Sequence, residues 1–232
     1  MPDASLSIGR LAPGAINNDL LEQTIGFIWD SLIPWRSASE CTSSPGEEDL
    51  NGNFHDFLSA RAAECFPMVF FRHEQRQEGR RRVDLAAKPV RPTIIEGMLY
   101  SWNDAFLVIE GKRLPAPSRD REFEYVSGEE KLSGGIQRFK LGLHGKNSKT
   151  AIMLGYLQQG TPLEWFTSIN GWIFNLIEKN PEEWTKHEFL LGLELSEGSA
   201  RSRCHSIHSR LASAGLGEIR LLHFWIQCPT DS

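Results

Sequence analysis

The chain has 232 residues, 40% of them apolar, and a formal net charge of −5. This length suits one sizeable domain, and seven Trp and thirteen Phe supply enough apolar surface for a buried core, which excludes a disordered chain. Charges interrupt the long apolar stretches and the N-terminus lacks a secretion signal, so we expect a cytoplasmic protein without a membrane segment. The negative charge also means that any nucleic-acid binding must rest on local clusters of Lys and Arg.

Helical patterns follow an irregular start. Residues 1–16 contain Pro and Gly without periodicity, and we expect them to form a loose lead-in. An apolar stripe from Leu21 to Leu32 predicts a helix that ends before Pro34. After a loop rich in Ser, a second stripe over residues 50–62 predicts another helix, with Glu47 on the same face.

The pattern then changes to that of β-strands. Short runs rich in Val, Phe, Leu and Ile predict neighbouring strands at residues 68–72, 82–90 and 105–114. Residues 91–104 are expected to form a loop or one helical turn.

The second half of the chain continues the alternation of helices and strands. It predicts helices at residues 134–143 and 162–177 and a short one after Asn180-Pro181, a buried strand at 151–157, and a C-terminal hairpin of strands 202–211 and 218–227. We therefore expect an α/β fold, with a mixed sheet flanked by helices, in a single domain that spans residues 17–232. The four scattered cysteines are expected to be free thiols.

The most informative segment is the strand that ends in Glu110-Gly111-Lys112. Strand periodicity places Glu110 and Lys112 on one face. Charges in an apolar strand cost several kcal/mol each unless they pair or bind an ion. The preceding strand carries a lone Asp84 between apolar residues, which supplies a second carboxylate for the same place.

Two carboxylates make a site for a hard cation. Mg²⁺ or Mn²⁺ prefers such oxygen ligands and keeps positions open for water and a phosphate oxygen. Lys112 would then orient or deprotonate the attacking water, or neutralise charge that develops on a phosphate.

An Asp followed by Glu-x-Lys on the next strand resembles the PD-(D/E)xK nuclease superfamily, over roughly residues 47–157. The family's proline is replaced by Val83 before Asp84. The resemblance implies a restriction-endonuclease-like fold, Asp84 and Glu110 as metal ligands, and Lys112 as a catalytic residue. It also implies an accessory acid on the helix before the strands, for which Glu47 is the match and Glu48 the neighbouring candidate.

The helix after the strands often carries a polar or basic residue that faces the site in this superfamily, here Gln137 or Arg138. The segments Glu124-Tyr125-Val126 and Gly135 to Phe139 are similar to those of uncharacterised bacterial members that resemble components of phage-defence or mobile-element systems. The resemblance implies hydrolysis of DNA, with RNA not excluded, and partner subunits such as an ATPase or helicase. The alternative is a non-catalytic subunit that keeps the fold and acts as an interaction or DNA-docking module.

Two polar groups have alternative interpretations. Arg80, Arg81 and Arg82 stand just before Asp84 and either contact a phosphate backbone or form a solvated turn. Ser206, His208 and Arg210 share one face of a predicted strand, which either touches phosphates or a partner or is a plain solvated face.

Two further groups are expected to be structural. His205 and His208 point to opposite strand faces and no second Cys lies at finger spacing, so we do not expect Cys204 to take part in a zinc site. Core packing is favoured over a protein-binding patch for the tryptophans Trp165, Trp172 and Trp184.

Overall fold

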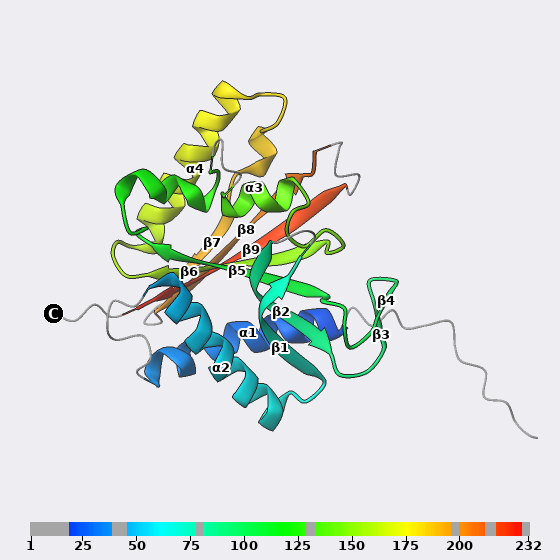
Figure 1. Ribbon diagram of the computed structural model, residues 1–232. Coiled ribbons are helices and arrows are strands. Elements are labelled where there is room, and N and C mark those ends of the chain that lie inside the picture. Colours follow the sequence, from blue (N-terminus) through cyan, green and yellow to red (C-terminus); the bar gives the residue numbers. More distant parts are fainter. Residues whose placement is uncertain are drawn as a thin grey trace, which may run out of the picture.

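A seven-stranded mixed sheet runs through the middle of the protein, with helices on both faces, as the sequence predicts for an α/β fold (Figure 1). The computed structural model describes residues 19–38, 46–77, 81–128, 133–195, 200–211 and 217–228. The strand order is β1-β2-β5-β6-β9-β8-β7, and β5 and β9 each run parallel to β6 while the other neighbours are antiparallel. The strands of this sheet are β1 (Val69–Arg76), β2 (Arg82–Pro89), β5 (Leu107–Leu114), β6 (Thr150–Leu157), β7 (Leu191–Leu195), β8 (Arg201–Ser209) and β9 (Glu218–Gln227).

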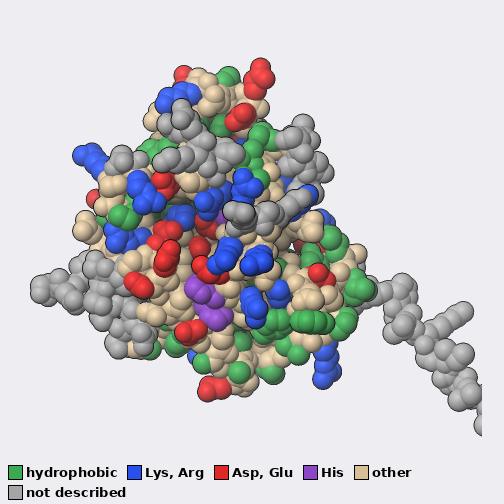
Figure 2. All heavy atoms as spheres, viewed as in Figure 1, with side chains coloured by type: hydrophobic (Ala, Val, Ile, Leu, Met, Phe, Trp, Pro, Cys, Tyr) green, Lys and Arg blue, Asp and Glu red, His purple; other side chains and the backbone are tan. Residues whose placement is uncertain are grey.

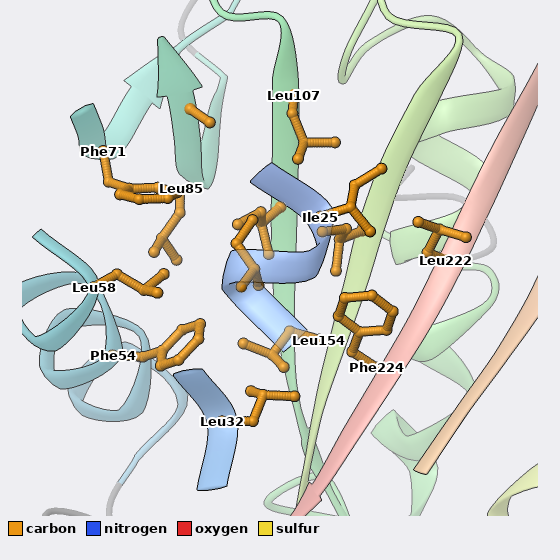
Figure 3. Packing of buried hydrophobic residues seen from close by; sticks show 14 of the residues in the cluster. Ile25, Leu32, Phe54, Leu58, Phe71, Leu85, Leu107, Leu154, Leu222 and Phe224 are labelled. Atoms are coloured by element: carbon orange, nitrogen blue, oxygen red, sulfur yellow. The ribbon is translucent and has the colours of Figure 1, made fainter. Parts of the chain in front are cut away.

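Each face of the sheet buries its own apolar core. Helices α1 (Asp19–Ser37) and α2 (Glu47–Cys65) cover one face, where Phe54, Leu85 and Leu107 belong to one apolar cluster (Figure 3). Helices α3 (Gly135–Lys140) and α4 (Pro162–Lys179) lie on the other face, which takes the alternate side chains of the same strands. Successive side chains of a strand point to opposite faces, so β2 and β5 contribute to both cores.

The first helix is longer than its sequence pattern predicts. It continues past Pro34 to Ser37, because Trp35 is fully buried against Phe54 and Tyr156, with ring centroids 5.1 and 5.6 Å away. This packing offsets the single backbone hydrogen bond that the proline removes near the helix end. The expected end before Pro34 is therefore wrong.

Two other expectations differ from the structure, and two elements were not predicted. Residues 91–104 contain a small hairpin of β3 (Thr93–Ile95) and β4 (Met98–Tyr100) that stands apart from the main sheet (Figure 1). The segment after Asn180 forms a turn and the short 3-10 helix η3 (Lys186–Glu188), and the strand β7, which the sequence analysis did not predict, follows it. A further 3-10 helix, η1, covers Arg119–Tyr125 between β5 and α3.

The C-terminal hairpin is confirmed by the continuous antiparallel pairing of β8 with β9. The expectation of free thiols holds for Cys65 and Cys204, but it is wrong for Cys228, which is disulfide-bonded. Cys41 lies outside the described residues. Among the helices that the structure describes, none is both long and apolar enough to cross a bilayer.

Candidate metal centre

The predicted acidic residues and Lys112 converge on one pocket at the end of β5. The pocket has a volume of about 530 Å³, and its lining residues include Glu47, Asp84, Glu110, Lys112 and Arg138. These side chains come from α2, β2, β5 and α3. Figure 2 shows acidic side chains gathered near the centre of this face, with Lys and Arg side chains around them.

Asp84 reaches the pocket because β2 and β5 stop pairing beside it. Their ladder ends at Leu85 and Ile109, whereas β2 continues to pair with β1 as far as Arg82. The carboxylate of Asp84 takes the place of the next backbone acceptor, since its Oδ2 accepts a hydrogen bond from the Gly111 amide at 2.7 Å. This bond places the Asp84 carboxylate at the backbone of the Glu-Gly-Lys segment.

Gly111 allows α2 to approach β5 closely. A Cβ at this position would overlap the side chain of Asn51, whose Oδ1 accepts a hydrogen bond from the Tyr156 hydroxyl at 2.9 Å. Glu47 lies one turn before Asn51 on the same helix face. Its two oxygens accept hydrogen bonds from Lys112 Nζ at 2.8 Å and from the Arg113 amide at 3.1 Å, which fixes the start of α2 over the end of β5.

Glu110 is the most buried acid of the group, with only 1% of its surface exposed. Its Oε1 lies 3.0 Å from the Arg138 guanidinium and 3.2 Å from Lys112 Nζ. Its Oε2 lies 3.2 Å from His144 Nδ1, but the two atoms are not aligned as a hydrogen bond, and Oε2 has no other partner within the described residues. Within the described residues, this buried carboxylate oxygen therefore has the His144 ring beside it but no well-aligned donor, which is unusual for a folded protein.

The two acids of the motif titrate in opposite directions. Burial, together with the charge of Glu110, raises the pKa of Asp84 from 3.8 to about 8. Burial also acts to raise the pKa of Glu110, but Lys112, His144 and Arg138 outweigh it and lower that pKa to about 2. The pKa of Lys112 is raised above its ordinary value, because Glu110, Glu47 and Asp84 outweigh the effect of burial. The cluster thus holds Glu110 ionised and lacks the positive charge that would ionise Asp84 fully at neutral pH.

These properties fit a divalent cation. An added cation near Asp84 and Glu110 would supply the missing positive charge, and carboxylate oxygens are the ligands that Mg²⁺ and Mn²⁺ prefer. No group of three or more His, Cys, Asp and Glu side chains in the described part of the chain is already arranged to hold a metal. The ammonium of Lys112 lies between Glu47 and Glu110 instead, so an ion that used both acids would require this side chain to move aside.

The structure also separates the two polar residues of α3. Arg138 points to Glu110, whereas Gln137 accepts a hydrogen bond from the Gly128 amide with its Oε1 and does not line the pocket. His144, which contacts Glu110, follows α3 in a loop and had no periodic signal in the sequence. Glu48 is exposed and is not among the lining residues.

The remaining predicted nucleic-acid contacts do not line this pocket. Arg81 and Arg82 are exposed, and Arg82 forms an ion pair with Glu74 of β1, while Arg80 lies outside the described residues. His208 and Arg210 are buried, with 0% and 7% of their surface exposed, so their assignment to phosphate contacts is wrong. Arg210 instead donates hydrogen bonds to the backbone oxygens of the loop at residues 145–148.

The polar face of β8 is buried because distant residues supply its partners. The Ser206 hydroxyl lies 2.7 Å from His208 Nε2 and 2.8 Å from His223 Nε2, and the other ring nitrogen of His223 lies 2.9 Å from the Tyr125 hydroxyl. His208 also packs edge-on against Trp184. The expected core role is confirmed for Trp165 and Trp184, which are buried in the core on the α4 side of the sheet. Trp172 packs against the same core and is partly buried.

Comparisons with known proteins give no relative: no protein-family model and no curated protein matches the sequence, and no solved structure matches the fold.

Proposed function

We propose that the protein is a metal-dependent nuclease of the PD-(D/E)xK type, acting on DNA or RNA phosphodiesters. The observation that carries this proposal is the meeting of Asp84, Glu110 and Lys112 at one pocket, where Glu110 is almost fully buried. Such a carboxylate pair with a neighbouring ammonium suits the binding of a divalent cation beside a phosphate.

The surrounding elements support the resemblance. Asp84 and the Glu-Gly-Lys segment lie on the adjacent antiparallel strands β2 and β5. The helix before them, α2, brings Glu47, and the helix after them, α3, brings Arg138. These are the places where the superfamily is expected to carry an accessory acid and a basic residue.

The residues then divide the chemistry among them. Asp84 and Glu110 hold a Mg²⁺ or Mn²⁺ ion, with Glu47 as an accessory ligand. The bound ion would lower the pKa of a water molecule and neutralise phosphate charge. Lys112 orients the attacking water or stabilises the charge that develops on the phosphate, and Arg138 limits the repulsion between Glu110 and that phosphate.

A non-catalytic docking subunit is the second candidate, and one observation favours it. Lys112, Arg138 and His144 already surround Glu110, so the cluster is partly neutralised without any ion. Such a subunit would serve a larger assembly, for example one with an ATPase or helicase, and would not cleave nucleic acid.

Cleavage and metal binding measured side by side decide between the candidates. The substrates are linear, supercoiled and single-stranded DNA and an RNA strand, each with Mg²⁺, Mn²⁺ or EDTA. We expect Asp84→Ala to lose both cleavage and stabilisation by Mn²⁺. Lys112→Ala should keep that stabilisation but cut about a hundredfold more slowly or worse. Activity that survives EDTA, or a Lys112→Ala variant that cuts as fast as wild type, would refute the catalytic mechanism.

A further inference from the structure

A second concave surface lies next to the candidate site, on the outer side of β1 and β2. Its volume is about 480 Å³, and we call it the basic groove. Four cationic side chains line it, namely Arg72, Arg76, Arg82 and Lys88, together with the carboxylate of Glu74. The exposed Trp102 also belongs to the lining. Figure 2 shows Lys and Arg side chains beside the acidic centre of this face.

Most of the positive charge in the basic groove is uncompensated. Glu74 pairs with Arg82, but Arg72, Arg76 and Lys88 form no ion pair within the described residues. Arg72 and Arg76 are exposed. Lys88 forms part of the floor, where its Nζ donates to the Asn103 carbonyl at 2.9 Å and keeps two further donors. In a chain with 30 acids and 25 Lys and Arg, this local excess of cations attracts an anion.

Surfaces that bind single strands combine positive charge with an aromatic side chain that is open to solvent, and the groove has both. Trp102 is 61% exposed and has no ring contact within the described residues. The Lys88 bond to the neighbouring Asn103 holds its turn against β2. A tryptophan of this kind stacks on an unpaired base, whereas both faces of a base inside a duplex are already covered.

The groove also shares strand β2 with the candidate site. Arg76 pairs with Arg82, and Arg72 pairs with Ala86, so the groove extends along both strands. Asp84 lies on β2 between the groove residues Arg82 and Lys88, about 7 Å from Arg82 along the strand. A strand bound in the groove therefore passes close to the acidic pocket.

We propose that the basic groove binds single-stranded nucleic acid, with Arg72 and Arg76 on its phosphates and Trp102 stacked on a base, and leads it to the candidate site. This inference rests on the proposed nuclease function for the fate of the strand, but the binding itself needs no metal. It names unpaired strands or overhangs as the substrate class.

Fluorescence anisotropy in EDTA tests the groove separately from cleavage. The probes are a labelled thymidine single strand, a duplex of equal length and an acidic polyglutamate peptide. We expect the wild type to prefer the single strand, and the Arg72→Ala, Arg76→Ala double variant to bind it at least about tenfold more weakly. The salt slope of that double variant should fall by about 1.4, or about 0.7 for each lost phosphate contact.

The stacking residue and a control complete the test. Trp102→Ala should weaken single-strand binding about fivefold or more, and Trp102→Phe should restore most of it. Arg220→Ala, which removes another exposed arginine from β9, should bind like wild type. The proposal is overturned if the double variant or Trp102→Ala binds the single strand as tightly as wild type. It is also overturned if the wild type binds the duplex or polyglutamate with the same affinity as the single strand.

The outcomes also separate this inference from the nuclease proposal. If the groove variants weaken binding but no metal supports cleavage, the proposed binding role of the groove is retained and the nuclease proposal is rejected. If the protein cleaves with metal and the groove variants cleave and bind like wild type, the nuclease proposal is retained and the binding role of the groove is rejected.

Discussion

Replacing Lys112 with methionine tests the electrostatic account of the site most directly. The Lys112 ammonium lies 2.8 Å from a Glu47 oxygen and 3.2 Å from Glu110 Oε1. Arg138 contacts the same oxygen of Glu110 at 3.0 Å. Methionine keeps the length and apolar stem of the side chain but removes its charge. The substitution therefore leaves buried carboxylates without their main counter-charge.

The expected loss of stability follows from burial. The Glu110 side chain is 2% exposed and that of Lys112 is 14%, so solvent screens the pair little. Removing one partner of a buried ion pair costs about 3–5 kcal/mol, and the remaining contact with Arg138 favours the lower end. In a domain of this size, about 3 kcal/mol lowers the melting temperature by about 6–12 °C.

Metal should reverse the loss. In the wild type an ion shared by Glu47 and Glu110 would have to displace the Lys112 ammonium, whereas in Lys112→Met that place is open and the carboxylates lack a counter-charge. Free Mn²⁺ at about 100 times its Kd adds about 2.7 kcal/mol, so the variant should regain most of its stability and gain more than wild type.

Melting scans with EDTA and with increasing Mn²⁺ measure both effects. The matched control is Lys149→Met, which removes an exposed lysine just before β6. If Lys112→Met melts like this control in EDTA, the ammonium does not compensate the acids. If Mn²⁺ stabilises it less than the wild type, the ion does not bind where Lys112 lies.

Three further predictions concern single residues. The folded state raises the pKa of Asp84 to about 8, so Asp84 holds a proton that the unfolded chain releases; its contribution to metal-free stability should fall as pH rises from about 4 to 8, which the difference between wild-type and Asp84→Asn melts in EDTA measures. Burial lowers the pKa of His223 well below its ordinary 6.5, so the contribution of His223 to stability should fall as pH drops below 6.5; His223→Gln should melt lower than wild type at neutral pH, and a difference that stays constant down to pH 5 would contradict this. Gly111→Ala should cost about 1–3 kcal/mol and impair the site by displacing Asn51, whereas Gly171→Ala, at an open helix position, should stabilise by about 0.5–1 kcal/mol in the same melts.

The sequence predicted the core of the site because its signals are local. A lone Asp84 and a Glu-x-Lys pair stand out in apolar strands, and the helical face of Glu47 can be read from its spacing to Leu50. Bringing Asp84 to the Glu-x-Lys pair required only that the two strands be neighbours, whereas Glu47 also required α2 to pack closely against β5. The structure places all of these residues on one pocket.

The errors come from contacts between distant segments. The alternation on β8 was recognised from the sequence, but the polar face of this strand is buried and Ile207 on the other face is exposed. Glu188 supplies a partner to this region, because it accepts a hydrogen bond from the Ser209 amide and lies 3.6 Å from His208. The apolar residues of the β3–β4 hairpin are similarly misleading, since Leu99 is 69% exposed. No local pattern reveals which polar stripe will find partners elsewhere in the chain.

The energetics of the site bear on the choice between a nuclease and a docking subunit. A cluster that keeps Glu110 buried with an unsatisfied oxygen, and Asp84 with a raised pKa, lowers the stability that two apolar cores supply. Apolar side chains of similar volume at such positions are often as stabilising or more so. A docking subunit needs only the basic groove, which shares no cation with this cluster. The proposed nuclease would use both features, because a strand bound by the groove would be hydrolysed at the cluster.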